Sequence, residues 1–135
     1  MSIAKTAIVT GANRGIGLEI ARQLVKEGIR VVMGSRDPVK GERACASLRA
    51  GDLAVSLALD VNDTRNVQRF VEFVEKAYGP PAILVNNAGV FPESSNALVT
   101  DTKTALWRET FETNLFGAVR MCRENGITVS PGACP

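Results

Sequence analysis

A glycine-rich turn near the N-terminus constrains the fold of this chain more than any other feature. A β-branched run, Thr6–Thr10, ends at Gly11, and a helical pattern begins at Gly15 and continues past Gly17. A strand that enters a helix through such a turn presents free backbone N–H groups and the positive end of the helix dipole, and these together bind phosphate. We expect Gly11 to permit a tight turn, Gly15 to let the backbone approach a pyrophosphate, and Gly17 to let the helix pack closely on the sheet. A glycine-rich connection without a ligand is the alternative, but the strand-to-helix context favours nucleotide binding.

Strand-like and helix-like segments alternate along the rest of the chain. Further strands are predicted at 31–33, 53–59 and 83–85. Helices are predicted from Pro38 to about Arg49, from Asn62 or Asp63 to Gly79, and after a polar loop that ends near Thr102. This alternation predicts an α/β fold, a Rossmann-type doubly wound parallel sheet of four main strands with helices on both faces.

Apolar residues at helical spacing predict which helix faces are buried. The predicted sets are Ile16, Ile20, Leu24 and Val25 in the first helix, Val67, Phe70, Val71 and Val74 in the third, and Trp107, Phe111, Leu115, Ala118 and Cys122 in the last.

The composition limits the chemistry that the chain can perform. Its 135 residues include no His, which excludes Ser-His and Cys-His nucleophilic systems and His-ligated metals, so we expect no metal site. The net charge of +2 is too small to predict binding to nucleic acid or to an anionic membrane. No apolar run approaches the roughly 18 residues of a membrane span, and the N-terminus lacks a signal-peptide pattern. The widely spaced Cys45, Cys122 and Cys134 are typical of reduced thiols, so we predict a cytoplasmic protein.

The glycine spacing, three residues and then one, resembles that of the short-chain dehydrogenase/reductase family. Asp60–Val61 follows the third strand, where the family holds the adenine ring. Asn86–Gly89 matches the family's Asn-Asn-Ala-Gly signature, and Asn114 matches the Asn of its fourth helix. The resemblance runs from about Thr6 to Val119 and is greatest to the carbonyl-reductase-like branch. It implies cofactor-binding roles for Gly11, Asn13, Arg14, Gly15, Ile16, Gly17, Arg36, Asp60, Val61, Asn87, Ala88 and Gly89.

Charge at the end of the second strand predicts which dinucleotide is bound. An acidic residue there would bind the ribose hydroxyls of NAD and repel a 2′-phosphate. Ser35 and Arg36 occupy that place, and Arg14 lies in the glycine-rich turn. Two guanidinium groups can bind a dianionic phosphate through charge-assisted hydrogen bonds, so we predict NADP(H). The alternative is that both are solvated surface arginines; Asp37 is interpreted as a helix cap.

The family's catalytic groups are not matched in this chain. In the family a Tyr donates the proton, a Lys four residues later lowers its pKa, a Ser holds the substrate oxygen, and the Asn matched by Asn114 holds a water that connects the Lys to solvent. The only Tyr here is Tyr78, and Ala82 stands four residues after it. An unperturbed phenol titrates near about 10, so it needs such a partner. We interpret Tyr78 as a helix-end residue and predict that the chain is inactive alone.

The last residues depart from the family pattern. We divide the chain into a nucleotide-binding half-domain, 1–123, and a tail, 124–135. The tail is either arbitrary sequence after a frame shift or premature stop, or the result of an internal deletion that brings in the family's sixth strand near 127–129. We favour the deletion, and in neither case is Ser130 the catalytic Ser.

Three functions fit these observations. The first is an NADP(H)-binding short-chain dehydrogenase/reductase half, whose family activity is carbonyl or alcohol oxidoreduction. The second is a non-catalytic partner of a full-length homologue, because the fourth strand would lack a neighbour on one side. The third is a carbonyl reductase that uses Lys103 and Glu109, although both fit solvent-facing positions better.

Overall fold

The computed structural model describes residues 4–92 and 98–126, and its centre is one parallel sheet. The strands are β1 (Thr6–Thr10), β2 (Arg30–Ser35), β3 (Ala54–Ala58) and β4 (Ile83–Val85). They lie in the order β3-β2-β1-β4, so the chain moves outward from β1 and then returns to its other side. The predicted doubly wound α/β fold is therefore confirmed. The further strand predicted near 127–129 falls outside the described residues.

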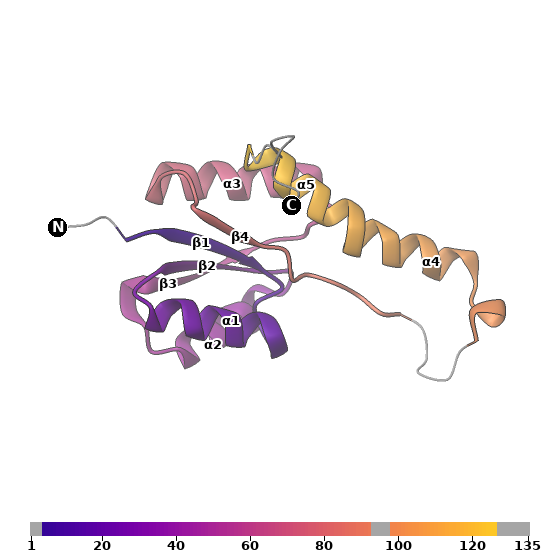
Figure 1. Ribbon diagram of the computed structural model, residues 1–135, viewed down its shortest axis with the longest axis horizontal. Coiled ribbons are helices and arrows are strands. Elements are labelled where there is room, and N and C mark those ends of the chain that lie inside the picture. The colour runs from indigo at the N-terminus through magenta and orange to yellow at the C-terminus, as the bar shows by residue number, and fades with distance from the viewer. Residues whose placement is uncertain (1–3, 93–97, 127–135) are drawn as a thin grey trace, which may run out of the picture.

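Helices cover both faces of the sheet (Figure 1). Helices α1 (Gly15–Lys26) and α2 (Pro38–Ser47) pack on one face, and α3 (Thr64–Tyr78) and α5 (Ala118–Glu124) pack on the other. Helix α4 (Thr104–Phe111) projects beyond the sheet and joins α5 through a π-helical turn, η3 (Glu112–Gly117). Two short 3-10 turns, η1 (Gly51–Leu53) and η2 (Val99–Asp101), complete the described elements.

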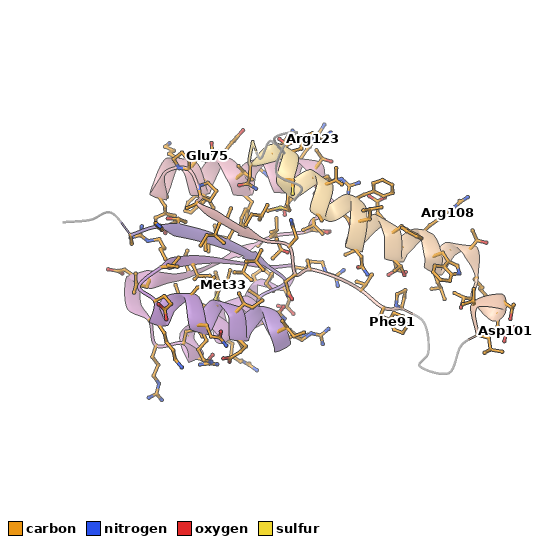
Figure 2. The ribbon with its side chains drawn as sticks, in the orientation of Figure 1. Met33, Glu75, Phe91, Asp101, Arg108 and Arg123 are labelled. Atoms are coloured by element: carbon orange, nitrogen blue, oxygen red, sulfur yellow. The ribbon has the colours of Figure 1, made fainter. Side chains whose placement is uncertain are left out.

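Successive residues of the central strands pack into two separate cores, one on each face of the sheet, because side chains alternate across a strand. Ile8 and Val32 face α3 and α5, whereas Val9, Val31 and Met33 face α1 and α2. Figure 2 shows Met33 between the sheet and the helices below it. All of these side chains are fully buried, and each contributes about 1.5–3 kcal/mol of hydrophobic free energy.

Carboxylate caps fix the starts of α2 and α3. Asp63 Oδ1 accepts hydrogen bonds from the N–H groups of Arg65 and Asn66, and Asp37 Oδ1 accepts one from that of Lys40. Such a cap contributes about 1 kcal/mol relative to alanine. The interpretation of Asp37 as a helix cap is thus confirmed.

The predicted buried faces are right for one helix and partly wrong for two. The third helix buries its predicted set, Val67, Phe70, Val71 and Val74. In α1 the predicted Ile20, Leu24 and Val25 are partly buried against the core, but Ile16 is 75% exposed. The fully buried residues of this helix are Gly17 and Ala21. The reason is that α1 approaches the sheet on its small residues, which turns the side chain of Ile16 outward.

The last helix differs most from its prediction. Trp107 and Phe111 are exposed because α4 projects beyond the sheet, and Leu115 is exposed in the π-helical turn that follows. The π-helical turn then changes the phase of the helix, since each of its turns holds one extra residue. The buried positions become Thr113, Gly117 and Met121, and Ala118 and Cys122 are only half-buried.

Candidate nucleotide-binding site

A cleft of about 710 Å³ opens at the carboxyl ends of the strands, where the strand order reverses between β1 and β4. Ligands of open α/β sheets bind at this position. Its walls come from the turn after β1 and from the loops after β2, β3 and β4. It is lined by Gly11, Asn13, Arg14, Gly15, Ile16, Ser35, Arg36, Asp37, Lys40, Leu59, Asp60, Val61, Asn87, Ala88, Gly89, Val90 and Thr113. Every residue predicted to bind the cofactor lines the cleft, except Gly17.

The three glycines of the first turn meet different constraints. Gly11 has a φ of 62°, and a Cβ on it would lie 2.9 Å from the Cα of Ala88, so the turn touches the loop after β4. A Cβ on Gly17 would overlap the Nδ2 of Asn87 and lie 2.7 Å from the carbonyl oxygen of Gly11. Gly15 has a φ of 57° and faces open space. Packing therefore requires glycine at 11 and 17, whereas conformation favours it at Gly15, on the open side of the turn.

Thr10 and Asn87 join the ends of β1 and β4. The Nδ2 of Asn87 donates to the carbonyl oxygens of Thr10 and Gly11, each at 3.1 Å. In return the Oγ1 of Thr10 accepts from the backbone N–H groups of Asn87, at 3.0 Å, and Ala88, at 2.9 Å. Both donors of the Asn87 amide are used within the protein, so this side chain shapes the cleft wall.

Basic side chains gather at the mouth of the cleft beside β2. Arg14 and Arg36 are exposed, and neither guanidinium group has a hydrogen-bond or ion-pair partner in the described part of the chain. Lys40, which the sequence analysis missed, also lines the cleft. Its ammonium lies 3.8 Å from the Oδ2 of Asp37, whose Oδ1 caps α2. The one carboxylate at this end is thus already engaged, and the two guanidinium groups remain available for an anion.

The loop after β3, the neighbour of β2 in the sheet, forms another wall of the cleft. The Oδ1 of Asn66 accepts from the backbone N–H of Asp60 at 2.7 Å, and the Oδ1 of Asp60 accepts from that of Asn62 at 3.0 Å. Leu59 and Val61 present apolar surface on either side of Asp60, and both are buried. A carboxylate between apolar groups suits a flat, polar-edged ring such as adenine.

Asn114 does not line the cleft; it holds one of the loops that do. Its Oδ1 accepts from the backbone N–H of Val90 at 2.7 Å, and its Nδ2 donates to the carbonyl oxygen of Val90 at 2.9 Å. A Cβ on Gly89 would lie 3.2 Å from the same Oδ1, so the loop and the side chain pack closely. The water-holding role implied by the family resemblance stays a prediction.

Sequence reasoning assigned no cofactor contact to Ser35 or Asp37, which also line the cleft, and it missed four further lining residues: Lys40, Leu59, Val90 and Thr113. Two of these four carry a signal in hindsight. Lys40 stands one helical turn after the Asp37 cap, and Thr113 immediately precedes Asn114. The other two are apolar loop residues with no distinguishing pattern.

Two groups with a shifted pKa, Cys45 and Glu19, do not line the cleft. Burial raises the pKa of the Cys45 thiol, which lies on α2 and packs, partly buried, against the core on that face of the sheet. The hydrogen bond from Gln23 lowers the pKa of the Glu19 carboxyl on the surface of α1. Within residues 4–92 and 98–126, no group of His, Cys, Asp or Glu is placed to hold a metal ion. No helix described there is long and apolar enough to cross a bilayer.

Tyr78, the single tyrosine, lies at the opposite end of the sheet from the cleft. It ends α3, its ring packs edge-on against Phe73, and the guanidinium of Arg30 lies 4.7 Å from its centroid. Lys103 and Glu109 are exposed on the projecting helix and do not line the cleft.

The parallel sheet, the cleft at its reversal point and the glycine-rich turn define a nucleotide-binding Rossmann protein. Residues 5–126 match the family model for short chain dehydrogenases, and the chain belongs to the short-chain dehydrogenase/reductase family. That match covers nearly all of the described residues, so the family fold accounts for the whole architecture seen here.

Individual relatives agree with this assignment. Over 125 residues the chain is 38% identical to "Carbonyl reductase [NADPH] 3" of Homo sapiens, with 91% of this chain and 44% of that protein covered. It is 39% identical to the NADP-dependent (R)-specific alcohol dehydrogenase of Lentilactobacillus kefiri, over 84% of this chain and 44% of that one. A crystal structure of an actinorhodin polyketide ketoreductase variant with NADPH superposes with a TM-score of 0.82 at 37% identity, covering 90% and 46% of the two chains. The chain thus spans less than half the length of these relatives.

Proposed function

We propose that this chain binds NADP(H) in the cleft, as the nucleotide-binding half of a carbonyl- or alcohol-transforming oxidoreductase. In this arrangement the pyrophosphate lies against the Gly11–Gly17 turn, the adenine lies beside Asp60 and Val61, and the 2′-phosphate lies between Arg14 and Arg36. When bound, the cofactor supplies or accepts a hydride; the residues described here bind and orient it.

The charge distribution at the cleft mouth carries this proposal. Arg14 and Arg36 both reach the cleft without a competing carboxylate, because Asp37 is occupied by the α2 backbone and by Lys40. Charge-assisted bonds to a phosphate are roughly twice as strong as neutral ones. The relatives named for NADPH or NADP support the same choice of cofactor.

A calorimetric titration of the full chain with NADPH and with NADH tests the proposal. We expect NADPH to bind more tightly. We expect Arg36→Ser to lower the affinity for NADPH by roughly tenfold or more and to change the affinity for NADH by no more than about twofold, since only NADPH carries the 2′-phosphate. Arg43→Ser is the matched control, because Arg43 is exposed on α2 and does not line the cleft. Equal affinity for the two cofactors would refute the assignment.

Catalysis by the chain alone is not part of this proposal. We predict no turnover with NADPH and reactive carbonyls, because the single tyrosine packs against Arg30 and Phe73 away from the cleft. Turnover that is lost in Lys103→Ala would instead support the third hypothesis.

A second candidate function, as partner of a full-length homologue, is favoured by one observation. Phe111, Leu115, Phe116 and Val119 are all about half exposed on the segment that runs from α4 through η3 into α5. Patches of this kind commonly mark interaction sites. We expect co-purification of the chain with a full-length relative, and loss of that association in Leu115→Lys; a monomer that ignores the relative would remove this candidate.

A further inference from the structure

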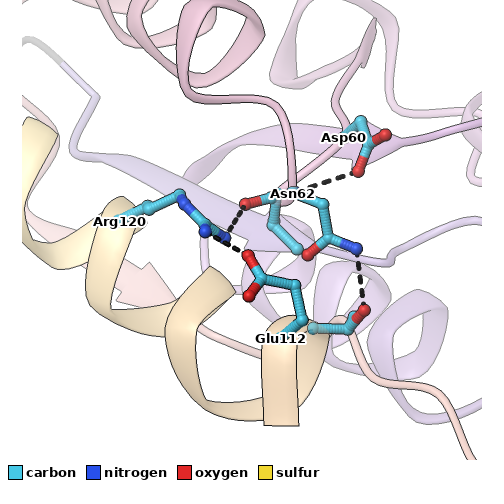
Figure 3. A network of polar contacts seen from close by, with 6 residues as sticks. Asp60, Asn62, Glu112 and Arg120 are labelled. Atoms are coloured by element: carbon cyan, nitrogen blue, oxygen red, sulfur yellow. Dashed lines mark hydrogen bonds and ion pairs between the residues drawn. The ribbon is translucent and has the colours of Figure 1, made fainter. Parts of the chain in front are cut away.

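A network of polar contacts ties the loop after β3 to a helix that follows about fifty residues later in the chain (Figure 3). The Nη1 of Arg120 donates to the carbonyl oxygen of Val61 at 3.2 Å, and its Nη2 pairs with Glu112. Beside this contact, the Nδ2 of Asn62 donates to the Oγ1 of Thr113 at 2.9 Å. Backbone and side-chain groups of the loop are therefore both held from outside the loop.

Close packing reinforces these bonds. A Cβ on Gly117 would lie 2.6 Å from the Cγ2 of Val61, so the helix backbone rests directly on this side chain. On its other side the loop is held by Asn66 of α3, which accepts from the backbone N–H of Asp60. The loop Asp60–Asn62 is thus clamped between α3 and the π-helical turn.

The same turn also holds the opposite wall of the cleft. Asn114, in the middle of η3, bonds the N–H and the carbonyl of Val90 after β4. β3 and β4 are the two outermost strands in the order β3-β2-β1-β4. A single turn of six residues therefore bridges the loops of both outer strands across the cleft.

We propose that Arg120 and Glu112 are positioning residues that set the place of the Asp60–Asn62 loop and thereby the affinity for the adenosine end of the nucleotide. The inference rests on the proposed NADP(H) function and extends it to residues that do not line the cleft. The Arg120 side chain is only 20% exposed, and its planar guanidinium serves a carbonyl and a carboxylate at once. Its loss would free the Val61 carbonyl and leave Glu112 without its cation.

Titration of the full chain with adenosine 2′,5′-bisphosphate, and separately with NADPH and NADH, tests the proposal. We expect Arg120→Met to lower the affinity for the bisphosphate and for both cofactors by the same factor, roughly tenfold. The preference for NADPH over NADH should not change, because Arg14 and Arg36 are untouched. The affinities of Arg120→Lys should lie between those of the unmodified chain and Arg120→Met. Its single ammonium can keep the ion pair with Glu112 but not the hydrogen bond to the Val61 carbonyl as well. An unchanged bisphosphate affinity in folded Arg120→Met would overturn the proposal.

Arg30→Met is the matched control for stability. Arg30 also bridges two elements, since its Nε donates to the carbonyl oxygen of Asp52 at 3.4 Å and its guanidinium stacks on Tyr78, but it does not line the cleft. We expect its melting temperature to fall while its nucleotide affinity stays within about twofold. An equal loss of affinity in Arg30→Met would reduce Arg120 to a purely structural role.

A gentler variant covers the case in which Arg120→Met does not fold. Asn62→Ala removes only the bond to Thr113 from an exposed position, and we expect roughly threefold weaker bisphosphate binding. No change in this variant would count against the clamp. Failure of the unmodified chain to bind any of the three ligands would refute the proposed function itself, which is a separate outcome.

Discussion

Two threonines at the ends of β1 offer a test in which one substitution has opposite expected effects. Thr6 and Thr10 are both buried, at 3% and 1% exposure, and Thr→Val preserves the shape of each side chain. The Oγ1 of Thr10 accepts two backbone N–H groups from the loop after β4. The Oγ1 of Thr6 has no hydrogen-bond partner among the residues that the structure describes.

The magnitudes follow from these partners. In Thr10→Val the N–H groups of Asn87 and Ala88 lose their acceptor, and each such buried donor costs about 1–3 kcal/mol. Allowing for some relaxation, we expect a loss of about 2–4 kcal/mol in the free energy of unfolding. In Thr6→Val a buried hydroxyl without a partner is replaced by a methyl group, so we expect a gain of about 1 kcal/mol.

Urea denaturation of the two variants, followed by circular dichroism, measures the difference directly. A chain of this size changes its melting temperature by roughly 3–5 °C per kcal/mol, so thermal melts should separate the variants clearly. Thr10→Val should also weaken NADPH binding, because it frees the wall of the cleft at Asn87. If the two variants lose the same stability, the hydrogen-bond reasoning is wrong.

Three further predictions concern single positions. Gly17→Ala should destabilise the protein by about 1–3 kcal/mol, because the added Cβ would overlap the Nδ2 of Asn87. Helix propensity alone predicts that alanine stabilises the helix, so an increase in melting temperature would contradict the packing argument. Asn114→Ala should release Val90 and speed amide exchange at that residue, whereas unchanged exchange would show that the loop holds itself. Cys45 should react with iodoacetamide more slowly in the folded than in the urea-unfolded chain, because burial raises its pKa. As the pH rises through the usual thiol range, the unfolded chain ionises before the folded one, so the free energy of unfolding should fall. Equal alkylation rates of Cys45 in the folded and unfolded chains, measured by peptide mapping, would refute the burial of this thiol.

The sequence was sufficient to predict a doubly wound parallel sheet of four main strands, because its signals are local. β-branched runs, helix caps such as Asp63, and the glycine-rich turn are each read within a few residues, and the parallel sheet follows from their alternation. The four apolar residues of α3 were predicted because that helix is regular and packs along its whole length.

The last helix shows where this reasoning stops. Trp107 and Phe111 are exposed because α4 projects beyond the sheet, which helical spacing cannot predict. Helical spacing also assumes a constant period, and the π-helical turn at Glu112–Gly117 breaks it, so Thr113 is buried and Leu115 is exposed. Ile16 was misplaced for a related reason, since the contact between Gly17 and Asn87 sets the rotation of α1. Both constraints arise from residues far apart in the sequence.

The candidate site also combines features that the sequence predicts with features that only the structure shows. The lining of the cleft by the glycine-rich turn, Arg14, Arg36 and the loops after β3 and β4 was anticipated from sequence. The brace between Thr10 and Asn87 and the clamp by Arg120 were not, because each joins segments about 60 to 80 residues apart. Only the three-dimensional arrangement shows which polar side chains face the ligand and which hold the walls.

Hydrogen–deuterium exchange of the full chain with and without NADPH tests the central claim most directly, because it reports where the nucleotide acts. We predict slower exchange at 11–17, 35–40, 60–62 and 87–90 when NADPH is present, and a smaller effect at 35–40 with NADH. Protection confined to other segments, or none at all at saturating NADPH, would contradict the placement of a phosphorylated dinucleotide in this cleft.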